Sequence, residues 1–124
     1  MPGVSPEELA LRRRVEDAFE RDDPRELEPL VLELALQSAE REWAESCCAQ
    51  LCRHRNAHVR GNALAGFAHL ARRFGQLDLH RVKRRVEIAL WDRHEYVRAQ
   101  AESAADDLET FLCWKLERPE AAAR

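Results

Sequence analysis

Apolar side chains recur every three or four residues through most of the chain, with polar residues between them. In the first such stretch, Leu11, Val15, Ala18 and Phe19 fall on one side of a helix and form a stripe that can pack against a neighbour. Short polar turns separate six stretches of this kind. The sequence therefore predicts an all-α protein with six helices, at residues 6–21, 24–37, 40–53, 57–74, 79–91 and 95–116.

Residues that favour helix ends stand at the predicted boundaries. Ser5, Pro6 and Glu8 offer an N-cap, a proline at the first helical position and the glutamate of a capping box. Residues 23–26 repeat this pattern with Asp23 as the N-cap. Further N-caps are predicted at Asn56, at Asp78 and at Asp92 or His94, and Gly75 is placed to end the fourth helix.

The last two helix pairs repeat one pattern. A shift of 38 residues places Val59 and Arg60 on Val97 and Arg98, and the stripe of the preceding helix also matches. Two helices in a unit of this length are typical of an α-α superhelix, in which stacked pairs share a continuous core. We expect one domain over residues 1–116, with a divergent capping pair at 6–37, pairs at 41–74 and 79–116, and a tail at 117–124 that frays.

The Val-Arg-x-x-Ala start of the second helix in each unit resembles HEAT repeats, over about residues 41–116. In that family the arginine pairs with an acidic residue of the preceding turn or of the neighbouring repeat. The resemblance implies a pair between Arg98 and Asp92. His54 stands where Arg60 would find its aspartate, so the partner of Arg60 must come from elsewhere. HEAT arrays bind many kinds of partner, so the resemblance implies a fold more than a function.

A narrower resemblance lies in the runs from Arg53 to Arg73 and from Ala89 to Leu112. Both are similar to small bacterial HEAT-like proteins found beside polymorphic toxins. Such proteins serve as immunity proteins against contact-dependent or secreted toxins. The resemblance implies a cytoplasmic protein that binds and neutralises a cognate toxin.

Composition agrees with a small helical domain. The chain has 124 residues, of which 45% are hydrophobic, enough for a packed core. No stretch reaches the roughly 18 consecutive apolar residues of a membrane span, and the N-terminus lacks the apolar run of a secretory signal. Without an export signal the four cysteines indicate reduced thiols in the cytoplasm. We expect no membrane partner.

Charge is distributed unevenly along the chain. Residues 1–46 carry 6 basic and 13 acidic side chains, residues 47–98 carry 11 and 4, and residues 99–124 carry 3 and 6. A basic middle segment can be the footprint of a nucleic acid. It can also be neutralised by neighbouring helices when they stack, which is the more common case. The basic run from Arg81 to Arg85 is expected on a solvated outer face.

No catalytic motif occurs in the sequence, so we expect a protein that is not an enzyme and takes no cofactor or small-molecule substrate. Cys48 and Cys52, with the nearby His54 and His58, raise the possibility of a zinc site. The two cysteines fall on the apolar stripe, however, where a buried thiol acts as a small hydrophobic group. We therefore expect no metal.

The side chains opposite the core stripes of the second helices are candidates for a partner surface. They combine small residues with acids and a tryptophan. Gly61 and Ala65 leave two explanations open: accessible backbone, or close packing of adjacent helices. The predicted partner-binding residues are Asn62, His69, Glu102, Ser103, Asp106, Asp107 and Trp114.

These observations favour a non-catalytic protein-binding module, and the resemblance implies that it is an immunity protein. Toxins of this kind include basic nucleases, whose active sites acidic surfaces could occlude. The alternatives are a nucleic-acid-binding module and an adaptor or lyase-type subunit of a larger complex. A chain this short and this poor in aromatic residues favours protein over nucleic acid as the partner.

Overall fold

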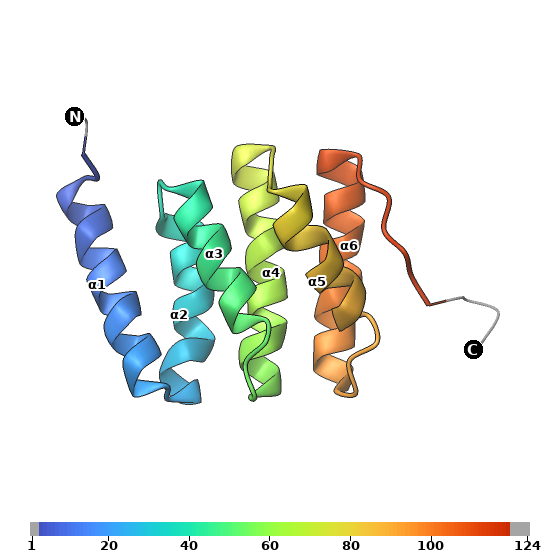
Figure 1. Ribbon diagram of the computed structural model, residues 1–124, viewed down its shortest axis with the longest axis horizontal. Helices are drawn as coiled ribbons and strands as arrows, with labels where there is room; N and C mark the ends of the chain where they lie inside the picture. Colours follow the sequence, from blue (N-terminus) through green and yellow to red (C-terminus); the bar gives the residue numbers. More distant parts are fainter. Residues whose placement is uncertain (1–2, 120–124) are drawn as a thin grey trace.

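A computed structural model describes residues 3–119, and within this range the chain is all-α (Figure 1). Each predicted helix is present, although three end differently from the prediction. Residue 40 precedes the third helix, and the third, fifth and sixth helices end two to four residues early. The helices are α1 (Pro6–Arg21), α2 (Pro24–Gln37), α3 (Arg41–Leu51), α4 (Ala57–Phe74), α5 (Leu79–Ala89) and α6 (Glu95–Leu112).

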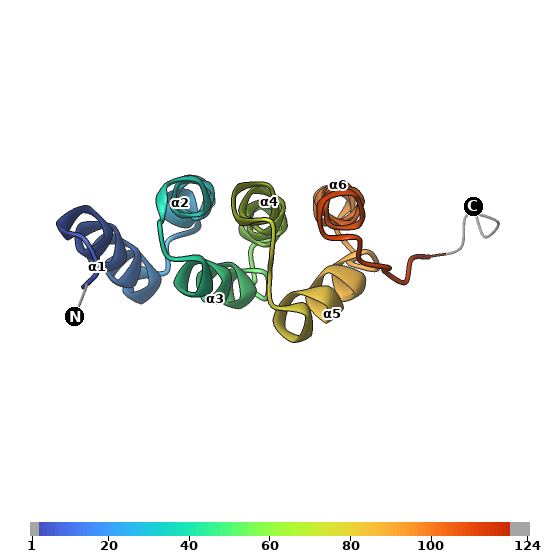
Figure 2. The same cartoon turned by 90° about the horizontal axis from the view of Figure 1, so that it is seen from above.

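The helices form two layers, seen from above in Figure 2. The back layer contains α2, α4 and α6 side by side, and the front layer contains α1, α3 and α5. Helix α4 is central, since it packs against α2, α3 and α6. Three antiparallel helix pairs therefore stand in a row and share one interior.

Local sequence explains the helix boundaries. The Ser5 hydroxyl accepts the backbone N–H of Glu8 at 3.1 Å, and Asn56 Oδ1 accepts those of His58 and Val59. Asp23, Asp78 and His94 cap α2, α5 and α6 in the same way. Gly75 ends α4 in the left-handed region at a φ of 67°, which glycine adopts without strain.

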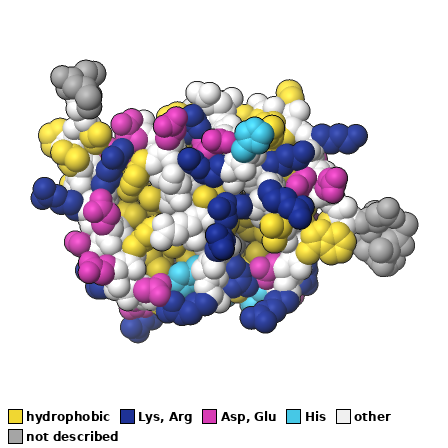
Figure 3. Space-filling model, viewed as in Figure 1, with side chains coloured by type: hydrophobic (Ala, Val, Ile, Leu, Met, Phe, Trp, Pro, Cys, Tyr) yellow, Lys and Arg dark blue, Asp and Glu magenta, His cyan; other side chains and the backbone are white. Residues whose placement is uncertain are grey.

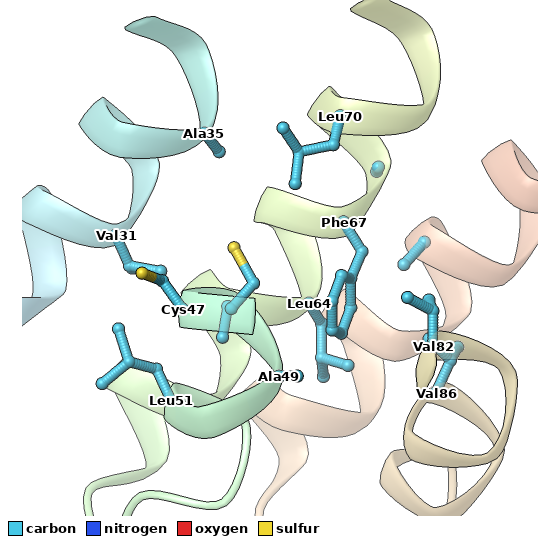
Figure 4. Close-up of a cluster of buried hydrophobic side chains, with 14 of the residues drawn as sticks. Val31, Ala35, Cys47, Ala49, Leu51, Leu64, Phe67, Leu70, Val82 and Val86 are labelled. Carbon is cyan, nitrogen blue, oxygen red and sulfur yellow. The ribbon is translucent and has the colours of Figure 1, made fainter. Parts of the chain in front are cut away.

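The core fills the space between the layers (Figure 4). Phe67 is its largest fully buried side chain, and in Figure 4 it points from α4 toward Val82 and Val86 of α5. Cys48 is also fully buried, and its Sγ would lie 2.7 Å from a Cβ added at Gly66. The prediction that Cys48 belongs to the core is confirmed.

An arginine–aspartate pair joins the second and third helix pairs. The guanidinium of Arg60 donates twice to the Asp92 carboxylate, at 3.0 Å each, and also to the backbone carbonyls of His54 and Arg55. Asp92 is thus the partner of Arg60. The expected pair between Arg98 and the Asp92 carboxylate is wrong, because Arg98 donates to the backbone carbonyl of Asp92 at 2.8 Å.

Three buried glutamates of the front layer hold the chain where it leaves each helix pair. Glu8, Glu45 and Glu87 are no more than 8% exposed. Their carboxylates accept the backbone N–H groups of Ala39 at 2.9 Å, Asp78 at 3.1 Å and Glu117 at 2.8 Å, respectively. Each of these amides lies outside the helices, where a buried unpaired N–H would be costly.

The segment after α6 is held against the last helix pair. Cys113 takes the left-handed conformation at a φ of 57° and ends the helix, so Trp114 lies beyond α6. Leu116 is buried, and Arg118 donates to Asp106 and Glu109 of α6. Residues 117 and 118 are therefore anchored, in contrast to the fraying expected from Glu117 onward. Residues 120–124 of the expected fraying tail lie outside the described residues.

Leu70 and Leu108 test the repeat register, because they occupy equivalent positions and are fully buried. We expect Leu70→Ala and Leu108→Ala each to lower the free energy of unfolding by about 2–5 kcal/mol, through lost burial and the cavity left behind. Denaturant titration measures this. Effects within about ±0.5 kcal/mol, as at surface sites, would contradict the shared core.

A substitution at Glu45 tests whether the buried carboxylates stabilise the fold. We expect Glu45→Ala to destabilise the fold by about 1–3 kcal/mol, because it leaves the Asp78 N–H without its acceptor and the Arg41 guanidinium without its buried carboxylate. Glu42→Ala is the matched control on the same helix, since the Glu42 side chain is 85% exposed. Equal effects of the two variants in thermal unfolding would contradict a role for the buried hydrogen bond.

Candidate functional site

The predicted partner-binding residues come from α4, α6 and the segment that follows α6, and only some of them form one cluster. Arg72 of α4 pairs with the carboxylate of Asp107 and contacts His69 Nδ1 at 2.8 Å. Burial lowers the pKa of His69, and the charge of Arg72 lowers it further. An imidazole, a guanidinium and a carboxylate thus bridge α4 and α6, and the charge of Asp107 is already neutralised within the fold.

Asp106 is more accessible than its neighbour Asp107. Its side chain is 70% exposed and accepts a hydrogen bond from Arg118 at 2.9 Å. Arg118 also donates to Glu109 at 2.7 Å. Glu102 and Ser103 are exposed on the same helix. These residues leave an acidic surface on the solvent side of α6 that is only partly neutralised.

Trp114 occupies a different position from the predicted one. It follows the left-handed Cys113 instead of lying on α6, and its half-buried side chain packs against the core. Part of the indole therefore stabilises the end of the helix row. Only the remaining part is available to a partner.

Asn62 holds helices together. Its amide donates to the backbone carbonyl of Glu28 in α2 at 2.9 Å and accepts from the Tyr96 hydroxyl of α6. A Cβ added at Gly61 would lie 2.5 Å from Cε2 of Tyr96. Of the two explanations for Gly61, close packing is the one that applies, because the tyrosine ring covers its backbone.

Three of the four cysteine thiols are buried or partly buried. Burial raises the pKa of Cys47 to about 12 and that of Cys48 well above its usual value. Burial also raises the pKa of Cys52, although nearby Arg85 opposes the shift. Within residues 3–119, no group of three or more histidine, cysteine, aspartate or glutamate side chains is placed to hold a metal ion.

Two groups of basic residues from the middle segment lie in different surroundings. Arg55, Arg60 and Arg72 pair with the carboxylates of Asp22, Asp92 and Asp107, which belong to neighbouring helix pairs. The expected neutralisation between stacked helices therefore applies to part of the segment.

The second group lies around a hollow between α3 and α5. This hollow of about 560 Å³ is lined by Ser46, Ala49, Gln50, Arg53, Arg81 and Arg85. Lys and Arg side chains gather over α5 and between α3 and α5 in Figure 3. The sequence identified the basic run on α5 but not its neighbour Arg53, because only the packing of α3 against α5 brings them together.

Comparisons with protein-family models, curated proteins and solved structures found no match to this chain. Among the described helices, none has both the length and the apolar composition needed to cross a membrane.

Gly61 provides a test of the packing between α4 and α6. We expect Gly61→Ala to destabilise by about 1–2 kcal/mol, because overpacking against Tyr96 outweighs the better helix propensity of alanine. In a Tyr96→Ala background the same change should stabilise the protein by up to about 1 kcal/mol. Unfolding of the four proteins of this cycle measures the coupling. The same sign in both backgrounds would contradict the contact.

Proposed function

We propose that the protein is a non-catalytic protein-binding module, and specifically an immunity protein that neutralises a cognate toxin in the cytoplasm. The observation that carries the proposal is the exposed acidic surface of α6, formed by Glu102, Ser103 and Asp106 on a helix whose other side is packed into the core. The resemblance to HEAT-like immunity proteins implies that the partner is a toxin.

The helix presents this surface at little entropic cost. Buried residues Ala101, Ala104, Ala105 and Leu108 fix α6 against the rest of the protein. A partner that binds Glu102 and Asp106 therefore need not order the backbone first. A basic toxin would be drawn to these carboxylates, and a bound helix layer would block access to its active-site cleft.

A cationic side chain of the partner could replace Arg118 at Asp106. Its pairs with Asp106 and Glu109 are partly exposed, and exposed ion pairs contribute little stability. An arginine or lysine of the partner could replace Arg118 with little loss. Asp107 is a weaker candidate than the sequence indicated, since Arg72 already occupies its carboxylate.

A nucleic-acid-binding module is the second candidate. The observation that favours it is the group of arginines around the hollow between α3 and α5. Phosphate groups would bind there with a strong dependence on salt. An adaptor or lyase-type subunit remains a third possibility, with no particular surface in its favour.

Charge reversal on α6 tests the immunity function. The tagged protein is used to capture its partner from native cells, and the partner is then expressed alone and together with each variant. We expect the partner alone to stop growth and the wild-type chain to restore it. Glu102→Arg with Asp106→Arg should slow association by about tenfold at low salt and reduce protection.

Glu16→Arg with Glu20→Arg is the matched control, because both side chains are exposed on the distant α1 and the change in net charge is the same. This variant should protect as well as wild type. Full protection by the α6 variant, or a captured partner that does not inhibit growth, would contradict the proposal.

A further inference from the structure

A groove on the front layer contains three arginines, two of which have no carboxylate partner in the described structure. Arg53 lies at the end of α3, and Arg81 and Arg85 lie one turn apart on α5, around the hollow of about 560 Å³. Within residues 3–119, neither Arg53 nor Arg85 forms an ion pair with an acid. The gathering of basic side chains over α5 and toward α3 is visible in Figure 3.

The acids near this groove are already bound or lie at its margin. Glu45 is fully buried beneath it and is shared by Arg41, by Arg81 at 3.6 Å and by the backbone of Asp78. Glu42 is 85% exposed at the start of α3, next to Arg41 at 3.7 Å. Asp92, at the other end, holds Arg60 at 3.0 Å. The groove therefore keeps a positive charge.

An apolar hollow continues the groove. It measures about 300 Å³, shares Arg53 and Arg85 with the first hollow, and is also lined by Cys52, Ile88, Ala89 and Asp92. Ile88 is 57% exposed, although it is a large aliphatic side chain. Trp91 is 68% exposed and lines a neighbouring hollow together with Arg93 and Arg98. Arginine and tryptophan are the residue types that most often dominate binding energy at protein interfaces.

We propose that this groove, formed by Arg53, Arg81, Arg85 and Ile88, binds an acidic protein segment that carries an apolar side chain beside its carboxylates. The guanidinium groups would receive the carboxylates in bidentate hydrogen bonds. The apolar side chain would enter the hollow at Ile88 and Ala89. This site is independent of the proposed function, because α6 lies in the back layer and the groove lies in the front layer.

The apolar half of the groove favours a peptide over a nucleic acid. Strands of nucleic acid bind where aromatic rings alternate with basic side chains, so that successive bases can stack. Here the cations adjoin aliphatic and thiol groups, and none of the described residues that line the two hollows is aromatic. The arginines alone could bind either ligand. The apolar Ile88 beside them would contact an apolar side chain of a peptide.

The test selects short random peptides displayed on phage against the wild-type protein and measures affinity of the enriched peptides by fluorescence anisotropy. We expect enriched peptides to combine two or more carboxylates with an aliphatic or aromatic residue. Arg85→Glu should weaken their binding by about tenfold or more. Arg13→Glu, an equal charge change on exposed α1, should leave it unchanged.

A second variant separates the two halves of the groove. Ile88→Ala removes an exposed side chain and should leave the fold intact. It should weaken the enriched peptide by about fivefold, while leaving unchanged the binding of the same peptide with its apolar residue replaced by serine. Circular dichroism confirms that each variant is folded.

Three outcomes would overturn the proposal. The first is a failure of the peptide test itself. Either the enriched peptides lack acidic residues, or Arg85→Glu and Arg13→Glu lower the affinity for them equally. The second is a labelled single-stranded oligonucleotide that binds more tightly than any enriched peptide and is lost in Arg85→Glu, which would assign the groove to nucleic acid. The third is self-association in sedimentation that Arg85→Glu abolishes, which would assign the groove to a second copy of the chain.

Discussion

The structure depends on a hydrogen bond that recurs where the chain leaves each helix pair. A buried glutamate of the front layer accepts the backbone N–H of a residue that follows the back-layer helix, as Glu45 does for Asp78 at 3.1 Å. A single helix pair cannot bury its own apolar side, so the pairs must be stacked closely. These carboxylates fix the loop that determines how each pair meets the next, and at the end of the row Glu87 fixes the segment after α6.

This arrangement explains why the two surfaces of the protein can differ in charge. Asp92 and Asp107 each neutralise an arginine of the preceding helix pair. Part of the positive charge of the middle segment is therefore neutralised where the pairs stack. Arg53 and Arg85 are left on the front layer, and Asp106 is left exposed on the back layer. An acidic and a basic candidate surface thus lie on different layers of one rigid scaffold.

The sequence predicted the helices well because apolar spacing and N-caps are local signals. The end of α6 was misplaced because Trp114 and Leu116 continue the apolar pattern after Cys113 has turned the backbone into the left-handed region. The role of Arg60 was left open, since its aspartate lies 32 residues further along the chain.

The buried glutamates were not predicted for a related reason. The amides of Ala39, Asp78 and Glu117 are spaced evenly, 39 residues apart, but the acceptors are not. Glu87 lies about one helical turn beyond the position equivalent to Glu45, so the repeat does not align them. The candidate site was predicted in part: the exposure of Asp106 follows from helical spacing, whereas the pairing of Asp107 depends on how α4 packs against α6.

Hydrogen exchange at the amides of Ala39, Asp78 and Glu117 tests most directly whether buried carboxylates fix the helix pairs. All three lie outside the helices, where backbone amides ordinarily exchange fast. We expect them to exchange as slowly as amides in the middle of α4. Exchange at the rate of exposed loop amides would contradict it, because the carboxylates would then not hold the chain at these points.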